Sequence, residues 1–290
     1  MRIGIKVNTN RDKGYACAYK AAQAILKYGA VPVLKPEDKE GFPPLDGVVY
    51  EDLSDASPDV IISVGGDGTF LATVAEYGGT DAAFIGINKG SIGFLAQIDE
   101  QDLDNCIGRL VKGDYKILLR NRLDVSVYNK DGVLKKRGLS LNDCSIGRGA
   151  KLHTVKLLLK VDGQVAERFI GDGLIISTAT GSTAYNLAAG GPVLMPEMRD
   201  MIITTNCSHT FSGFSYVVSP DSIVEVIVEP FETPPIICLD GRDLVDFEDN
   251  DRVVIKAYGK MLKTIDFNPE GFFNVIRRKI IMKGSFYENS

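Results

Sequence analysis

The hydrophobic pattern of this chain changes near residue 113, and the change limits the folds that the chain can adopt. Before that point, short apolar runs of strand type alternate with amphipathic stretches of helix type. Strands are expected at 2–7, 31–34, 60–64 and 84–87, and helices at 15–28, 69–77 and 99–111. Strands that alternate with helices indicate βαβ units and a parallel sheet. Residues 1–112 are therefore predicted to form an α/β domain in which helices flank a parallel sheet.

Residues 113–265 have a different pattern, because their apolar residues recur with a period of two. Leu123–Tyr128 and Val155–Val161 are examples, and Asp162-Gly163 and Asp240-Gly241 are typical of the hairpin turns between such strands. A short helix is expected only at 184–189. This segment is predicted to be a mainly β domain, a sandwich or another two-sheet unit.

The C-terminal segment, 266–290, changes pattern once more. Pro269 lies near a helix start, and the apolar residues of 269–280 are spaced to fall on one helix face. Because a lone terminal helix needs a surface that covers its apolar face, we expect this helix to pack back on the α/β domain.

Charge and composition argue against several classes of protein. The net charge of −5 and the pI near 5.2 disfavour binding to nucleic acid or to anionic membranes. Apolar runs such as Val60–Val64 fall far short of the ~20 residues that cross a bilayer. The N-terminus lacks a secretory pattern, so a cytoplasmic location is expected. Five scattered cysteines and two histidines favour neither disulfides nor a His-rich metal site.

The strongest local motif is the glycine-rich turn at residues 65–69, which directly follows an apolar strand and begins a helix. Such a turn gathers backbone N–H groups at a helix N-terminus and favours an anion. Phosphate binding is predicted for Gly65, Gly66, Gly68 and Thr69. The turn fits neither a Walker A motif nor a G-x-G-x-x-G motif.

Asp67 is the unusual member of this turn, because a carboxylate repels phosphate unless it accepts a proton or holds Mg²⁺. Both roles belong to phosphoryl transfer, so Asp67 is the candidate catalytic residue. The alternative from the residues alone is a plain strand–helix turn in which Asp67 caps the helix.

Two further clusters carry polar side chains after strand patterns. Residues 171–186 run from Gly171-Asp172-Gly173 through an apolar strand into a hydroxyl-rich turn, whose side chains can satisfy polar ligand atoms without adding charge. Asn142-Asp143 suits vicinal ribose hydroxyls. The alternatives are a solvated loop and an Asx turn.

In this order, Gly65–Thr69, Leu141–Asp143, Gly171–Gly173 and Ser177–Tyr185 closely resemble the NAD kinase family, and the resemblance extends over nearly the whole chain. Phosphofructokinases, diacylglycerol kinases and sphingosine kinases share the glycine-rich motif, so the stretch 171–185 is what narrows the resemblance. It implies phosphorylation of the adenosine 2′-hydroxyl of NAD by ATP or polyphosphate. Mg²⁺ would enter with the donor, and the resemblance also implies a homodimer or homotetramer.

The resemblance also implies roles for individual residues. Asp67 matches the proton acceptor, and Gly68 contributes to the nucleotide site. Asn142 and Asp143 match the pair that holds the ribose hydroxyls, in a domain that would bind NAD, and Asp172 matches the acidic residue of the nicotinamide-side pocket. No protein ligand is assigned to the metal. The other substrate-binding positions are Thr180, Thr183, Ala184, Tyr185, Ala188, His153 and Arg242, and the flanking loop supplies Asn88, Gly90, Gly93 and Phe94.

The chain departs from the family pattern at three places. Ala179 replaces a usual Pro, which frees a backbone N–H; Ala188 replaces a common Ser; and Phe214-Ser215 stands where many members have Arg-Pro. Two other functions stay open: a kinase for a lipid or a sugar phosphate that shares the glycine-rich motif, and a dinucleotide sensor without catalytic activity.

Overall fold

The structure, a computed structural model, describes residues 1–89, 93–149, 153–209, 213–267 and 271–277. The chain divides into two compact units, one of Met1–Leu119 with Leu262–Ser290 and one of Arg120–Met261. We expected boundaries after residues 112 and 265. The observed ones lie elsewhere because β7 (Lys116–Arg120) and β20 (Leu262–Asp266) belong to the sheet of the first unit, where the Thr264 hydroxyl donates to the Leu118 carbonyl at 3.0 Å.

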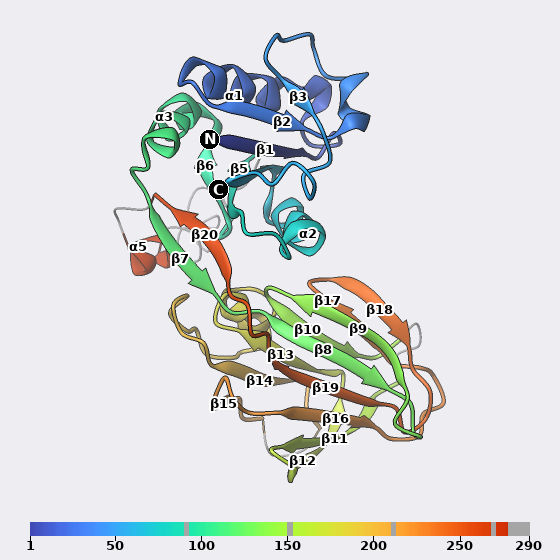
Figure 1. The fold of residues 1–290 in the computed structure, drawn as a ribbon. Helices are drawn as coiled ribbons and strands as arrows, with labels where there is room; N and C mark the ends of the chain where they lie inside the picture. Colours follow the sequence, from blue (N-terminus) through green and yellow to red (C-terminus); the bar gives the residue numbers. More distant parts are fainter. Residues whose placement is uncertain (90–92, 150–152, 210–212, 268–270, 278–290) are drawn as a thin grey trace, which may run out of the picture. The chain divides into compact units, whose positions relative to one another are not determined.

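The first unit is built on an eight-stranded sheet of order β3-β2-β1-β4-β5-β20-β7, with β6 also paired to β5 (Figure 1). Strands β1 to β6 and β20 pair in parallel, which confirms the predicted parallel sheet. The remaining bounds are β1 (Arg2–Val7), β2 (Val31–Leu34), β3 (Val49–Tyr50), β4 (Val60–Gly65), β5 (Ala83–Asn88) and β6 (Ala96–Asp99).

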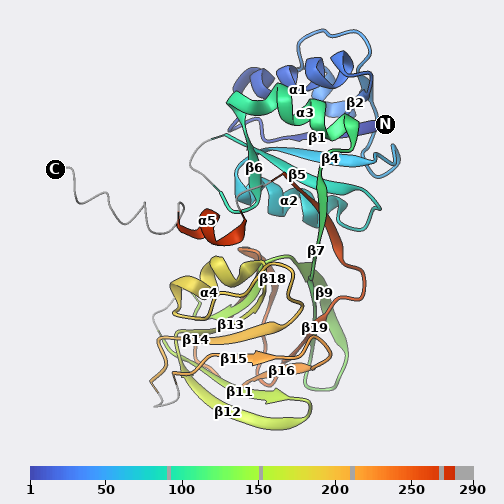
Figure 2. The ribbon, with the colours of Figure 1, turned by 90° about the vertical axis from the view of Figure 1, so that its left-hand side faces the viewer.

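Helices cover both faces of this sheet. Figure 2 shows α1 (Ala16–Lys27) and α3 (Leu103–Lys112) on one face and α2 (Asp67–Tyr77) on the other. Helix α1 begins where the buried Asp12 carboxylate accepts the N–H groups of Cys17 and Ala18, both at 2.9 Å, and it is followed by Gly29 at φ +81°. The sheet residues that face α1 and α3 are aliphatic and buried, and they form the core of the unit.

Strand order fixes where a ligand can bind. From β1 the chain passes to β2 on one side, and β4 lies on the other side of β1. The carboxyl ends of β1 and β4 therefore form a topological switch point, and α/β sheets bind ligands at such points. The glycine-rich turn directly follows β4, at this place in the sheet.

The second unit consists of two six-stranded antiparallel sheets, as expected for a mainly β domain. The first sheet contains β15 (Tyr216–Val218), β14 (Met201–Asn206), β13 (Gly173–Thr178), β10 (Asp143–Gly147), β17 (Ile236–Leu239) and β18 (Arg242–Asp246). The second contains β12 (Gln164–Gly171), β11 (Val155–Val161), β16 (Val224–Val228), β19 (Arg252–Ala257), β8 (Leu123–Tyr128) and β9 (Leu134–Ser140).

The period of two along β10 separates a core face from an outer face. Cys144 and Ile146 are buried in one apolar core with residues of both sheets. Asp143 and Ser145 alternate with them and so belong to the outer face of the first sheet. The short helix α4 (Tyr185–Ala188) follows β13, as predicted.

The C-terminal segment contains one described helix, α5 (Phe272–Ile276), and none of its residues is buried. We expected a helix over 269–280; residues 268–270 and 278–290 lie outside the described part of the chain, so its length and its packing stay predictions. Within the described ranges, no helix has both the length and the apolar character needed to cross a membrane.

Candidate functional site

The turn between β4 and α2 is held in a fixed shape by its neighbours. Gly65 ends β4, and a Cβ at this position would collide with the Thr69 hydroxyl, so glycine is required. The Asn8 side-chain amide, just after β1, donates to the Thr69 hydroxyl at 3.0 Å, and the Lys89 N–H after β5 donates to the Gly65 carbonyl at 2.7 Å. Gly66 precedes α2, and its carbonyl accepts the N–H groups of Thr69 and Phe70, both at 3.0 Å.

Asp67 is the first residue of α2 and makes no capping hydrogen bond, so the helix cap that was the alternative is not observed. Its carboxylate instead accepts three backbone N–H groups from consecutive residues: Phe94 at 2.7 Å on Oδ2, and Leu95 and Ala96 at 3.0 Å on Oδ1. A carboxylate offers about four lone-pair positions, so one remains for a ligand. A Cβ on Gly93 would collide with Oδ1, so this close approach also requires glycine.

The structure places Phe94 of the expected flanking loop beside Asp67, but the contacts of this loop were not predicted. Asn88 ends β5, Phe94 reaches Asp67 through its backbone, and Gly90 lies outside the described residues. Asn8, Leu95 and Ala96 were not predicted. Two of them act through backbone N–H groups, which every residue except proline carries, so no side-chain pattern could reveal them.

In the second unit, the backbone of residues 141–143 is held from both sides. The Asp240 carboxylate accepts the N–H groups of Leu141 at 2.9 Å, Asn142 at 2.7 Å and Asp143 at 3.2 Å. From the other side, the Thr178 hydroxyl donates to the Leu141 carbonyl at 2.6 Å, and the Thr178 N–H donates to the Asn142 carbonyl at 2.8 Å. We call residues 141–143 the clamped turn.

The clamped turn presents polar atoms that lack protein partners. The Asn142 side-chain oxygen is buried and accepts no hydrogen bond in the described part of the chain, so it does not form the Asx turn that was the alternative. The Asp143 side chain is on the outer face of β10. Burial and the nearby Asp240 carboxylate raise the pKa of Asp143 to about 7. Burial also raises the pKa of Asp240, although three N–H groups and Arg242 oppose that rise.

The hydroxyl-rich turn after β13 serves mainly to build the site. The hydroxyls of Ser177, Thr178 and Ser182 donate to backbone carbonyls, and all three side chains are buried. Thr180 is also buried, and its hydroxyl accepts from Arg120 Nη1 at 3.2 Å. The expectation that these hydroxyls face polar ligand atoms is therefore wrong for Ser177, Thr178 and Ser182, because their protons go to the backbone.

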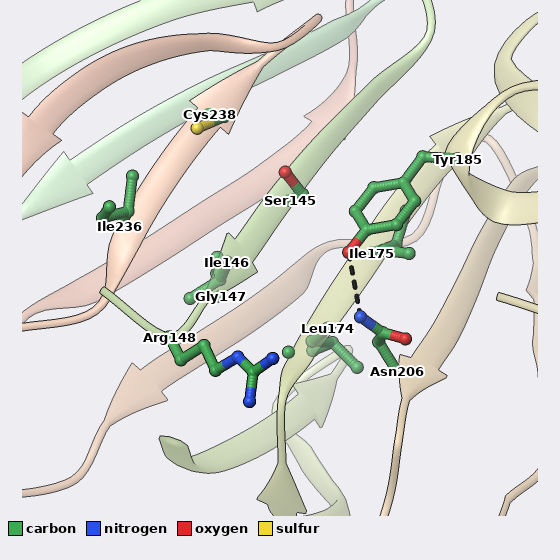
Figure 3. A pocket seen from close by; sticks show the side chains of 11 residues that line it. Ser145, Ile146, Gly147, Arg148, Leu174, Ile175, Tyr185, Asn206, Ile236 and Cys238 are labelled. Atoms are coloured by element: carbon green, nitrogen blue, oxygen red, sulfur yellow. Dashed lines mark hydrogen bonds between the residues drawn. The ribbon is translucent and has the colours of Figure 1, made fainter. Parts of the chain in front are cut away.

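A hollow of ≈ 190 Å³ lies beside the clamped turn, on the outer face of the first sheet (Figure 3). Ser145 continues the row of Asp143 along β10 into this hollow. The Tyr185 ring lies across it, and the Tyr185 hydroxyl accepts from the Asn206 side-chain amide at 2.9 Å. Arg148 also lines it and lies 3.2 Å from the Asp172 carboxylate. Such a hollow suits a flat ring with a polar edge.

The remaining predicted residues differ in their distance from the clamped turn and in their exposure. Thr183 and Ala184 are half-buried just before α4, and Ala188 is exposed at its end. Arg242 is exposed, with its guanidinium 3.9 Å from the Asp240 carboxylate. His153 lies 3.5 Å from Glu232 and makes no hydrogen bond to the other predicted residues of the described chain. Within that same part, no three His, Cys, Asp or Glu side chains gather as a metal site.

Comparisons with known proteins cover both units. Two family models match the chain: the ATP-NAD kinase N-terminal domain over residues 4–115 and the ATP-NAD kinase C-terminal domain over residues 141–267. A protein of Acetivibrio thermocellus named NAD kinase is 32% identical to this chain, and the match covers 98% of each of the two chains. A protein of Corynebacterium diphtheriae with the same name is 34% identical over 91% of this chain and 86% of its own.

Two solved structures are similar in fold. Yeast NADH kinase complexed with NADH has a TM-score of 0.88 at 20% identity, and the match covers 99% of this chain and 89% of that one. An NAD kinase from Archaeoglobus fulgidus in complex with ATP has a TM-score of 0.70 at 25% identity, and the match covers 96% of this chain and 99% of that one. The first likeness concerns the fold alone.

Proposed function

The chain belongs to the NAD kinase family, and from this premise we propose that it transfers the γ-phosphoryl group of ATP to the adenosine 2′-hydroxyl of NAD, which gives NADP. The observation that carries the proposal is the Asp67 carboxylate, which three backbone N–H groups hold beside the glycine-rich turn. A fixed acceptor beside a phosphate-binding turn is what transfer to a hydroxyl group needs.

The donor binds through its phosphates. The glycine-rich turn and the N-terminus of α2 favour the triphosphate. Mg²⁺ enters as part of the donor substrate and neutralises phosphate charge that would otherwise repel Asp67. Polyphosphate has the same chemistry and is the second donor to be assayed.

The acceptor hydroxyl uses the one lone-pair position that Asp67 keeps free. The 2′-oxygen attacks the γ-phosphorus in line, the bond from phosphorus to the β–γ bridging oxygen breaks, and ADP leaves. The hydroxyl proton passes to Asp67 and then to water. Asp67 orients the hydroxyl for in-line attack and accepts its proton as the bond to phosphorus forms. Positioning and electrostatics supply most of the acceleration.

We assign the adenosine end of NAD to the second unit. Asn142 offers a buried side-chain oxygen that has no partner among the described residues, and Asp143 offers a carboxyl. Both can accept from ribose hydroxyls, of which the 2′-hydroxyl gives its single proton to Asp67 at the moment of transfer. The hollow lined by Tyr185, beside Asp172, would take the other end of the dinucleotide.

Two coarser properties are also proposed on the strength of the family resemblance: a homodimer or homotetramer, and a cytoplasmic location. Light scattering of the purified protein measures the first, and fractionation of the source cells measures the second. A monomer at micromolar concentration would overturn the oligomer.

The activity is tested with purified protein, NAD, ATP and Mg²⁺, and NADP is read by an NADP-specific dehydrogenase. We expect NADP from the parent chain, a loss of orders of magnitude in kcat for Asp67→Asn, and normal turnover for Asp46→Asn, which changes an exposed carboxylate of the same unit. Near-normal turnover of Asp67→Asn would remove Asp67 from the catalytic role.

Other outcomes separate the alternative functions. If ATP gives no NADP, polyphosphate is assayed next. NAD binding without turnover by either donor would indicate a dinucleotide sensor. Turnover of a lipid or sugar phosphate without NAD binding would indicate another kinase.

A further inference from the structure

Asp240 is a buried carboxylate in a place where a hairpin does not need one. It precedes Gly241 in the turn between β17 and β18, at φ +51°, and its side chain is 2% exposed. Asp162 occupies the same position before Gly163 in the β11–β12 hairpin, at φ +50°, and is exposed. The turn geometry is therefore compatible with an exposed side chain, and the burial of Asp240 needs another explanation.

The contacts of Asp240 supply that explanation. Burial of a carboxylate is costly unless hydrogen bonds compensate for lost water, and the cost rises here because Asp143 lies close by. The compensation comes from three N–H groups of the clamped turn, all within 3.2 Å. Because Asp240 binds the backbone of consecutive residues, it fixes their peptide planes and so the directions in which their side chains leave the turn.

Two side chains that leave the clamped turn, those of Asn142 and Asp143, carry acceptor oxygens. The Asn142 side-chain oxygen is buried and has no donor among the described residues, and an unpaired buried acceptor is costly unless a ligand supplies a donor. Thr178 holds the carbonyl side of the same turn, so the backbone there has little freedom. A turn that is fixed this firmly around open acceptors is suited to hydroxyl donors at a set spacing.

We propose that Asp240 is a positioning residue of the nucleoside site: it fixes the clamped turn so that Asn142 and Asp143 present their oxygens to the vicinal hydroxyls of a ribose. This inference rests on the proposed function only in naming ribose as the ligand group. It adds a residue that touches no substrate and acts through the backbone of two residues that do.

The charge of Asp240 has a second effect, which a purely structural residue would not have. The titratable groups that interact with its charge are Asp143 on β10, Arg242 on β18 and the Cys144 thiol on β10. The Asp240 charge raises the pKa of Asp143. Its neutralisation therefore lowers that pKa and moves any pH dependence of ribose binding to lower pH.

The test measures ribose recognition without catalysis. Calorimetry with adenosine and with 2′,3′-dideoxyadenosine, repeated between about pH 5.5 and 8.5, gives the affinity that the two hydroxyls contribute. We expect the parent chain to prefer adenosine at least about tenfold, since hydrogen bonds to a charged group are strong. For Asp240→Asn we expect a preference below about threefold and a pH midpoint shifted to lower pH.

Asp162→Asn is the matched control, because it makes the same chemical change in the same kind of turn. It should keep the parent preference and the parent pH profile. Asp240→Asn values equal to those of Asp162→Asn would overturn the inference.

A second variant covers a failure of Asp240→Asn to fold. Thr178→Val loosens the clamped turn from its carbonyl side and leaves the Asp240 carboxylate in place. A reduced preference for adenosine in this variant supports the inference, and an unchanged preference overturns it. Failure of the proposed function is recognised separately, as a parent chain that prefers adenosine over the dideoxynucleoside but makes no NADP.

Discussion

Replacement of Asp143 by asparagine should make the protein more stable, and more so at alkaline pH. In the folded chain, burial first and the Asp240 carboxylate second raise the pKa of Asp143 from an ordinary 3.8 to about 7. The folded state therefore prefers the neutral carboxyl, while the unfolded chain ionises freely. Asparagine has nearly the same shape and stays neutral at every pH.

The size of the effect follows from linkage. Between about pH 4 and pH 7 the folded state binds more protons than the unfolded state, so the free energy of unfolding falls as pH rises. A rise of about three units in the pKa of Asp143 is worth about 4 kcal/mol, and the folded parent chain loses this much stability above pH 7. Near pH 5 the loss is only about 2 kcal/mol, because this pH lies about one unit above the ordinary pKa of the unfolded carboxyl.

Equilibrium urea unfolding of the parent chain and of Asp143→Asn, at about pH 5 and pH 8, measures both values. The gain of the variant should be larger at pH 8 by about 2–3 kcal/mol. Asp131→Asn, in the exposed turn between β8 and β9 of the same unit, is the control and should show no such difference. A gain of equal size at both pH values would refute the buried-carboxyl reasoning.

The other predictions concern catalysis and binding. Gly93→Ala places a Cβ against Asp67 Oδ1 and should lower kcat at least about tenfold with little change in the KM for NAD. Gly79→Ala is its control, because a Cβ there meets nothing within 4 Å. Equal kcat values for the two variants in steady-state kinetics would contradict the prediction. Asn142→Ala removes the buried side-chain oxygen of the clamped turn and should raise the KM for NAD about tenfold with a smaller effect on kcat. Asn105→Ala, on an exposed face of α3, is the control and should change neither constant. An unchanged KM in Asn142→Ala would place the ribose elsewhere.

Periodicity predicted the strands and helices of the first unit well, but not all members of its sheet. The expected strands at 2–7 and 31–34 coincide with β1 and β2. Strands β7 and β20 directly adjoin the β unit in the sequence, one before it and one after it, and carry strand-type residues like those of that unit. An alternating pattern of apolar and polar residues indicates that one face of a strand is covered, but it does not indicate which strand pairs with it. The domain boundaries therefore differ from the expected ones.

The candidate site was predictable where side chains carry the chemistry and hidden where the backbone does. Asn142 and Asp143 were proposed from their own donors and acceptors together with the family resemblance, and their role stays a prediction. The hydroxyl-rich turn was identified as a ligand surface, yet the hydroxyls of Ser177, Thr178 and Ser182 bind carbonyls of its own fold. Whether a hydroxyl faces a ligand or the backbone depends on which segments lie beside it, and sequence alone does not give that.

Asp67 and Asp240 use one structural device for different purposes. Each carboxylate accepts the N–H groups of three consecutive residues, 94–96 for the first and 141–143 for the second. Asp67 is half-buried, so its remaining lone pair is within reach of a substrate hydroxyl. The Asp240 side chain is 2% exposed, so its oxygens reach only the main chain that they hold. If burial assigns the roles in this way, Asp67→Asn affects kcat while NAD still binds, and Asp240→Asn weakens ribose binding while a saturated enzyme still turns over. A drop in kcat of equal size in both variants, at saturating NAD, would show that burial does not separate the two carboxylates.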